Sequence, residues 1–150
     1  MNKIQLLILI SAFWATGCGY RYEPGDLYRD GENKGIVIDT DDAGNVKLIM
    51  SLDEISGIDA DSATKWATST GNGWRLPTKN EIEKIRKYKA LSNKTLNRKK
   101  MPPVLSGHTF YWTSTPCSES HTYACGPDGT KCYFSTNASV QYRARAVKEI

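Results

Sequence analysis

The stretch from Trp66 to Ile85, WATSTGNGWRLPTKNEIEKI, constrains the fold of this 150-residue chain more than any other. Thr78 can accept a hydrogen bond at the start of a helix, and Glu81 follows three residues later, which is the spacing of a capping box. Ile82 and Ile85 then recur at near-helical spacing. The stretch therefore predicts a helix that begins at Thr78 and buries one apolar face.

The residues before this helix predict a first helix and a turn. Residues 59–67 place acids ahead of alanines and Trp66, which is typical of a helix with negative charge near its positive end. Trp74 follows a glycine-rich run, and Pro77 disfavours helical backbone just before it. We expect the two helices to pack through Trp66 and Trp74. Arg75 is expected to be structural, either as an ion-pair partner or as an aliphatic stem over Trp74.

The start of the chain has the composition of an export signal. Lys3 precedes a short apolar run, and Ala15–Cys18 supplies small residues followed by a cysteine. This pattern predicts a signal peptide over 1–17 and a lipidated Cys18, as in bacterial lipoproteins; an ordinary signal peptide cut nearby is the alternative. Residues 18–24 are then expected to form a tether, although its tyrosines could also pack on the domain, and a lipid is expected to hold the protein to the membrane.

The remaining residues, 25–150, are enough for one domain with a hydrophobic core. The formal charge of +4 is a mild excess and does not indicate a nucleic-acid partner. The expected location is the cell envelope, in the outer membrane of a Gram-negative bacterium, on its periplasmic or its surface-exposed face.

Two apolar, β-branched runs at 35–40 and 46–52 predict a hairpin, because the residues between them are Asp, Ala, Gly and Asn. Asp39, Asp41 and Asp42 could be proposed as calcium ligands. The positions where a calcium loop needs further oxygen ligands hold Ala and Met instead, so a plain turn is the preferred interpretation.

Residues 84–100 contain eight basic side chains and no acid. Such a run can be a docking face for a polyanion or for anionic lipid heads, but a solvated helix face that runs into a loop is the simpler interpretation. The run lacks the interleaved aromatic residues of a single-strand nucleic-acid platform.

The C-terminal third returns to strand patterns. Residues 110–115 are aromatic and β-rich, and 131–136 are their expected partner across a loop. Residues 140–147 alternate, which predicts one half-exposed strand with Arg143 and Arg145 facing outward or forming an ion pair.

Three cysteines remain once Cys18 is acylated, and an exported protein can form disulfides. The spacing favours Cys117–Cys132, with Cys125 as the alternative partner of Cys117. A zinc site that also uses His121 is a further alternative, although its spacing is not common among zinc sites. We expect no metal or other cofactor and no catalytic residues.

The order GIVIDTDDAGNVKLIMSLDE, ATKWAT, NGWRLPTKNEIEKI, FYWTST and YRARAV resembles the Fibrobacter-type "major paralogous domain" family of exported bacterial proteins. That family of unknown function is related to the C-type-lectin-like fold of formylglycine-generating enzymes. The resemblance runs from about Gly35 to the last residue. It implies an α+β domain with a twisted, mostly antiparallel sheet, two helices and a long irregular loop region.

In that fold the ligand-facing surface lies at Ser106–His108, at the loop 116–130 and on the exposed side of the last strand. The residues placed there are His121, Tyr123, Arg143 and Arg145. The calcium-binding motifs of sugar-binding C-type lectins are absent, and no cysteine clearly matches the copper pair of the enzymes. We therefore expect a module that binds a glycan or a protein at the cell surface. An enzyme of the formylglycine-generating type and a structural or pilus-associated subunit are the alternatives.

Overall fold

The computed structural model describes residues 19–127, 129–134 and 139–150, without the side chains of 131–134. The predicted signal peptide and Cys18 lie outside these residues. Within them the chain forms, in order, β1 (Leu27–Asp30), β2 (Asn33–Thr40), β3 (Val46–Met50), β4 (Ile55–Ile58), α1 (Ala60–Ser69), α2 (Lys79–Lys87), α3 (Lys89–Arg98), β5 (Tyr111–Ser118), β6 (His121–Gly126), β7 (Gly129–Phe134), β8 (Tyr142–Ala144) and β9 (Val147–Glu149).

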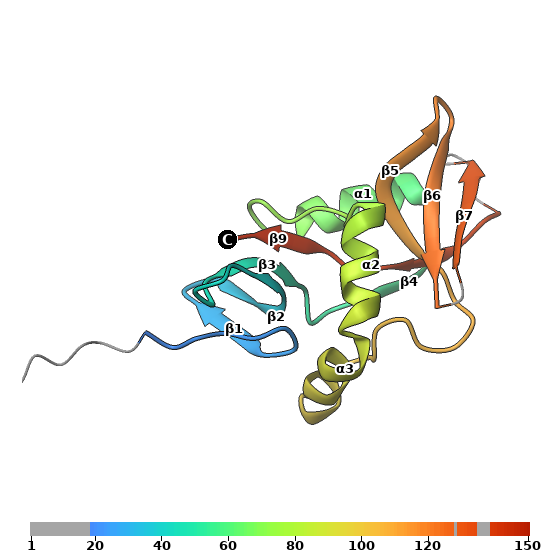
Figure 1. Ribbon diagram of the computed structural model, residues 1–150. Coiled ribbons are helices and arrows are strands. Elements are labelled where there is room, and N and C mark those ends of the chain that lie inside the picture. Colours follow the sequence, from blue (N-terminus) through green and yellow to red (C-terminus); the bar gives the residue numbers. More distant parts are fainter. Residues whose placement is uncertain (1–18, 128, 135–138) are drawn as a thin grey trace, which may run out of the picture.

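The strands form two sheets, which lie on either side of α2 in Figure 1. The first has the order β1-β2-β3-β9 and the second the order β4-β8-β5-β6-β7. The pairings are antiparallel except that of β5 with β8, where Tyr111 lies opposite Arg143. The predicted α+β class with a mostly antiparallel arrangement is confirmed.

Both faces of the sheets are buried, and alternate residues enter two separate cores. In β2, Val37 belongs to one core, whereas Ile36 and Ile38 belong to the other. In β5, Trp112 belongs to the first of these cores and Tyr111 to the second. Successive side chains of a strand point to opposite faces, so the sheets form a middle layer between two layers of helix.

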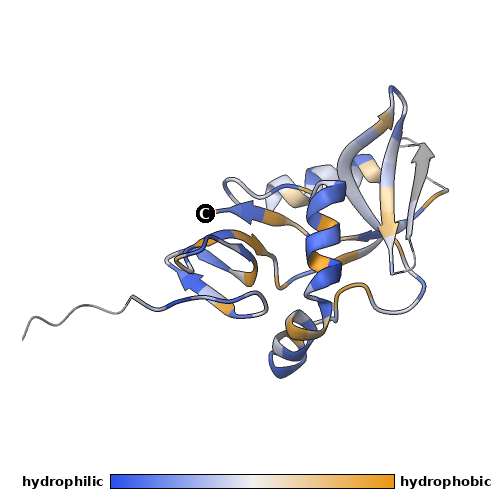
Figure 2. Cartoon of the chain, in the orientation of Figure 1, coloured by the Kyte–Doolittle hydropathy of each residue, from blue (hydrophilic) through white to orange (hydrophobic). Residues whose placement is uncertain are grey.

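The helices cover these two faces. α1 contributes Ala63 and Ala67 to the core that contains Trp74 and Trp112. α2 and α3 contribute Ile82, Ile85 and Leu96 to the other core. Most of the surface of α2 is hydrophilic, with a short hydrophobic stretch in its middle (Figure 2). Trp66 and Trp74 both belong to the first core, whereas α2 packs on the second, so the expectation that the two helices pack together through these tryptophans is wrong.

The helix start that the sequence predicts at Thr78 is confirmed. The Glu81 amide donates to Thr78 Oγ1 at 3.2 Å, and the Thr78 amide donates to Glu81 Oε2 at 2.7 Å. Arg75 donates to both oxygens of Glu81 at 2.7 and 2.8 Å and to Glu149 Oε1 at 2.7 Å. The expected structural role of Arg75 as an ion-pair partner is therefore also confirmed. Arg75 thereby links the start of α2 to β9.

The hairpin predicted for 35–52 is formed by β2 and β3, with a register shift near Asp39. The Asn45 amide and Asn45 Nδ2 both donate to the Asp41 carboxylate at 2.8 Å. These two bonds hold the loop as a turn, which was the preferred interpretation. They also lower the pKa of Asp41.

Three further expectations about the fold are wrong. Residues 131–136 were expected to pair with 110–115, but β6 lies between β5 and β7. The single strand expected over 140–147 is divided into β8 in one sheet and β9 in the other. A third helix, α3, follows α2 where a loop was expected. Among the described residues, none of the helices has the length and apolarity that a membrane crossing requires.

Candidate functional site

The structure places two of the predicted ligand-binding residues on one strand. His121 and Tyr123 lie two residues apart on β6 and are both half-buried. His121 Nδ1 lies 2.8 Å from Ser118 Oγ and 3.0 Å from Ser120 Oγ. Lys79 Nζ lies 4.7 Å from the centre of the Tyr123 ring, which is cation–π distance.

Arg143 lies away from His121 along β5. It pairs with Tyr111 at the start of β5, whereas His121 pairs with Ser118 at its end. Seven residues of strand separate these two ends, which is about 23 Å. Arg143 and His121 therefore lie at opposite ends of β5, and Tyr123 lies between them, beside Thr113. Arg143 does contact the predicted Ser106–His108 segment, because its Nη1 lies 3.4 Å from Ser106 Oγ.

Arg145 is buried and forms an ion pair, which was one of the two alternatives for this strand, so its placement on the ligand-facing surface is wrong. Its side chain is 1% exposed and donates to three backbone carbonyls, those of Ser51, Leu52 and Pro102, at 2.6–3.1 Å. Its Nη2 also lies 3.1 Å from Glu54 Oε2. Through these bonds Arg145, which lies between β8 and β9, connects the residues after β3 with the loop after α3.

Glu54 is the acid at the centre of this buried group. Its carboxylate is 6% exposed and lies 3.3 Å from Arg143 and 3.1 Å from Arg145. Tyr111 Oη donates to it at 2.5 Å. Burial, together with this hydrogen bond and the charge of Glu54, raises the pKa of Tyr111 to about 12. The Tyr111 phenol therefore keeps its proton and stays a hydrogen-bond donor to Glu54.

Cys125 is free and buried, so the alternative disulfide Cys117–Cys125 is wrong. The side chain of Cys132 lies outside the described residues, and the bond Cys117–Cys132 stays a prediction. Burial raises the pKa of the Cys125 thiol, while a hydrogen bond with Thr130 acts in the opposite direction. Cys125 thus lacks the thiolate character of a reactive cysteine. In the described part of the chain, no three His, Cys, Asp or Glu side chains converge as metal ligands would.

One cavity of about 370 Å³, here called the Trp74 pocket, combines an aromatic residue with polar groups. Its apolar lining is Trp74, Leu52 and Met101, and its polar lining is Glu32, Lys34, Ser51, Asp53 and Thr70. The pocket lies in the size range of small-molecule sites. Sequence reasoning missed it, because its lining comes from four segments and only Trp74 stood out.

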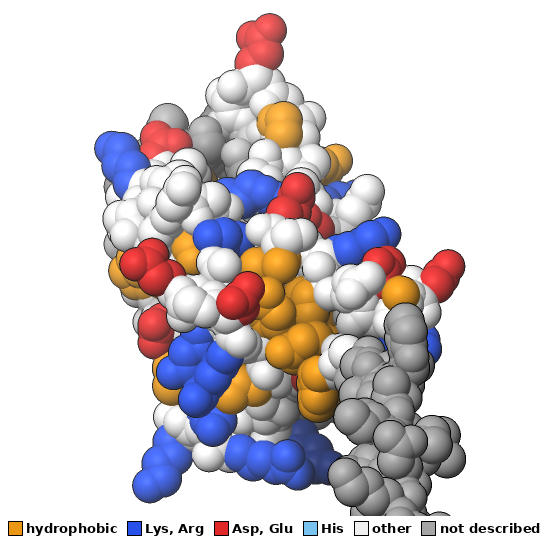
Figure 3. All heavy atoms as spheres, turned by 90° about the vertical axis from the view of Figure 1, so that its left-hand side faces the viewer, with side chains coloured by type: hydrophobic (Ala, Val, Ile, Leu, Met, Phe, Trp, Pro, Cys, Tyr) orange, Lys and Arg blue, Asp and Glu red, His pale blue; other side chains and the backbone are white. Residues whose placement is uncertain are grey.

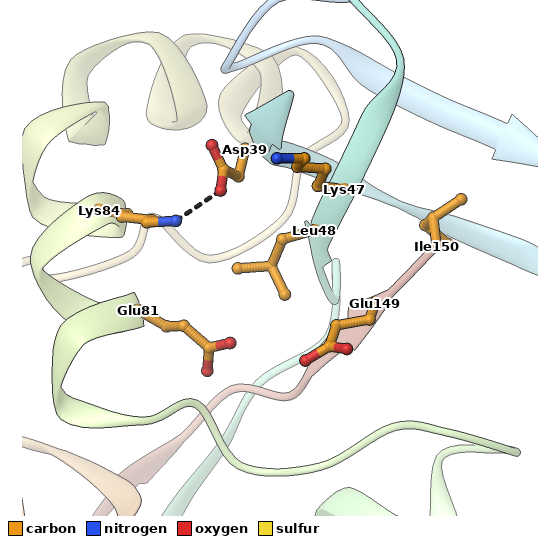
Figure 4. Close-up of a pocket in the computed structure, with 7 residues that line it drawn as sticks. All are labelled: Asp39, Lys47, Leu48, Glu81, Lys84, Glu149 and Ile150. Carbon is orange, nitrogen blue, oxygen red and sulfur yellow. Dashed lines mark hydrogen bonds and ion pairs between the residues drawn. The ribbon is translucent and has the colours of Figure 1, made fainter. Parts of the chain in front are cut away.

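A second cavity of about 350 Å³, here called the charged pocket, lies between α2 and the first sheet (Figure 4). It is lined by Asp39, Lys47, Leu48, Glu81, Lys84, Glu149 and Ile150. Its carboxylates are already paired: Lys84 Nζ lies 2.5 Å from Asp39, and Arg75 binds both glutamates. A lining that satisfies its own charges leaves little for a ligand to gain, so this pocket is the weaker candidate.

No protein-family model matches the sequence, and no curated protein matches it either. The fold and the pockets therefore define the class of protein: a two-sheet α+β domain with an open pocket that combines aromatic and polar groups.

Proposed function

We propose that this protein is a lipid-anchored component of the bacterial cell envelope whose domain binds a glycan without catalysing a reaction. The Trp74 pocket is the observation that supports the ligand class. A sugar ring has an apolar face of C–H groups and a rim of hydroxyls. The pocket offers a matching combination, the accessible part of an indole beside two carboxylates and an ammonium group. The Ser51 and Thr70 hydroxyls also line it, but they already donate to the Asp53 and Trp66 carbonyls.

The pocket wall is held in place by contacts of its own. Trp74 is 8% exposed, and its amide donates to the Gly71 carbonyl at 3.2 Å. Ser51 Oγ donates to the Asp53 carbonyl at 2.8 Å, and the Ser51 amide donates to the Ala146 carbonyl at 2.8 Å. A wall that is already ordered loses little entropy when a ligand binds, which favours affinity.

The glycan proposal can be tested with residues 19–150, which contain every element described above, on a panel of bacterial and host glycans. We expect Asp53→Asn and Glu32→Gln each to weaken binding roughly tenfold or more, because each removes a charged acceptor for a sugar hydroxyl. The controls are Asp42→Asn and Glu119→Gln, two exposed acids that do not line this pocket. Absence of binding to any glycan, or equal losses in the controls, would rule the proposal out.

The β6 surface is the second candidate, with a protein as its ligand. Tyr123, whose ring lies under the Lys79 ammonium, is a half-buried tyrosine on this surface, and tyrosine is enriched at protein interfaces. Tyr123→Ala separates the two candidates. It should leave glycan binding unchanged if the Trp74 pocket is the site, and it should abolish capture of a protein partner from the envelope if β6 is the site.

The lipid anchor has its own test. In a bacterial host, the wild-type chain should fractionate with membranes and carry a diacylglyceryl mass at Cys18. Cys18→Ser should move the protein to the soluble fraction. Membrane retention of that variant would mean that another feature holds the protein there.

A further inference from the structure

The segment that follows Cys18 packs on the domain. The Tyr22 amide donates to the Gly44 carbonyl at 3.1 Å, and the Gly25 amide donates to the Val37 carbonyl at 2.8 Å. The Tyr20 and Tyr22 rings are 4.7 Å apart, and Tyr22 lies 5.3 Å from Tyr28. Cys18 therefore lies at most about 14 Å of extended backbone from Tyr22, the first residue whose amide is bonded to the domain.

The large hydrophobic side chains that the described residues expose gather beside this segment. They are Tyr20, Leu91 and Ile150, at 71%, 51% and 45% exposure. Tyr20 and Ile150 line one shallow hollow, together with Tyr22 and Tyr28. Leu91 lines another, which is formed by α3 and residues 23–26. Leu91 is thus an exposed apolar side chain in a hollow that residues 23–26 help to form, separate from the hollow of Tyr20 and Ile150.

Basic side chains of α3 border the same hollow. Lys94 and Arg98 line it with Leu91, and Thr95 Oγ1 donates to the Gly25 carbonyl at 2.7 Å. Lys99 and Lys100 follow at the end of the helix and are exposed. Figure 3 shows Lys and Arg side chains at the lower end of the molecule, where α3 lies in Figure 1.

Two acidic side chains also lie in this region and reduce its net positive charge. Glu23 and Asp26 line the α3 hollow. Asp26 accepts a hydrogen bond from the Glu23 amide at 3.0 Å and so turns partly toward its own backbone. The C-terminal end of α3 and the two residues after it carry four cations, compared with these two acids: Lys94, Arg98, Lys99 and Lys100. The surface keeps a positive excess next to its exposed leucine.

We propose that this surface, defined by Leu91, Lys94, Arg98, Lys99 and Lys100 and called the docking face, lies on an anionic phospholipid bilayer. A single acyl signal holds a protein weakly, whereas lipid plus a basic patch anchors it stably. The exposed leucine would enter the headgroup region, and the cations would contact lipid phosphates. The inference relies on the proposed lipid at Cys18 only for the orientation of the domain.

Co-sedimentation of residues 19–150 with vesicles tests the docking face without the lipid. We expect binding to phosphatidylcholine vesicles that contain phosphatidylglycerol and little binding to phosphatidylcholine alone. Lys94→Gln with Arg98→Gln should lower the partition coefficient roughly tenfold or more, since each basic residue near the surface contributes about 1 kcal/mol. Salt should weaken the wild-type interaction, because the Debye length falls from about 10 Å at 0.1 M to about 3 Å at 1 M.

The matched control is Lys47→Gln with Lys65→Gln, which removes two exposed lysines of β3 and α1. It should bind as the wild type does. Equal binding to both vesicle types, equal losses in the two double variants, or binding to a sulfated polymer but not to vesicles would each overturn the proposal. The glycan test changes Asp53 and Glu32, which are not part of the docking face, so either proposal can fail alone.

Discussion

The Glu54 carboxylate is 6% exposed and faces two guanidinium groups and one phenol. Taking a carboxylate out of water is costly, and the nearby positive charges offset that cost. Each partner comes from a distant part of the chain, with Arg145 91 positions away. Glu54 thus connects the loop after β3 with β5 and with the link between β8 and β9.

Removal of this carboxylate should be strongly destabilising. We expect Glu54→Ala to lower the free energy of unfolding by about 3–5 kcal/mol, because Arg145 would remain buried without a counter-charge. Urea denaturation followed by circular dichroism measures this. Glu119→Ala, at an exposed position, should change the value by no more than about 0.5 kcal/mol. A loss of similar size in both variants would mean that the buried ion pairs do not stabilise the fold.

The cysteines allow a second measurement on single residues. Cys125 is buried and its thiol pKa is raised, so it should resist alkylation in the native protein and react after unfolding. Peptide mapping without reduction should find Cys117 linked to Cys132. Rapid native labelling of Cys125 would contradict its burial, and a Cys117–Cys125 peptide would contradict the pairing.

At the scale of elements, the start of α2 depends on one ionised side chain. Glu81 accepts from Arg75 and from the Thr78 amide. Burial alone would raise the pKa of Glu81, but the hydrogen bonds and charge of Arg75 and the Thr78 amide outweigh burial and lower it. A carboxyl whose pKa is lower in the folded state stabilises the protein above its unfolded pKa, which is about 4.3.

The stability that Glu81 contributes should therefore be complete near neutral pH and should be lost as the pH falls below about 4.3 and through the lowered folded pKa. Urea denaturation at a series of pH values tests this expectation. Glu81→Gln should give a shallower fall in acid than the wild type, and Glu119→Gln should match the wild type. Identical pH profiles for the wild type and Glu81→Gln would show that Arg75 does not hold this carboxyl ionised.

The elements that the sequence predicted are those determined by nearby residues. The start of α2 could be predicted because its capping partners lie three residues apart, and the β2–β3 hairpin because its turn is local. β6 was missed because HTYACG mixes polar and small residues and becomes a strand only between β5 and β7. The burial of Arg145 could not be predicted from its alternating neighbours, since it depends on Glu54.

At the scale of the molecule, the two sheets share their cores. One core combines Val37 and Ile49 of the first sheet with Trp112 and Ala124 of the second. The other places Ile85 of α2 among residues from both sheets. The chain also passes from β8 in one sheet directly to β9 in the other. Neither sheet has a core of its own, so the two should lose structure together.

We therefore expect a single cooperative unfolding transition, as is usual for chains below 150 residues. Native-state hydrogen exchange read by mass spectrometry should give β2–β3 peptides and β5–β6 peptides the same opening free energy. Ile85→Ala should lower both by the same amount, about 2–5 kcal/mol, because its side chain contacts the shared core. If β5–β6 opened at lower free energy, or if Ile85→Ala affected one sheet alone, the sheets would be separate units, and the link through Arg145 and Glu54 would not be enough to couple them.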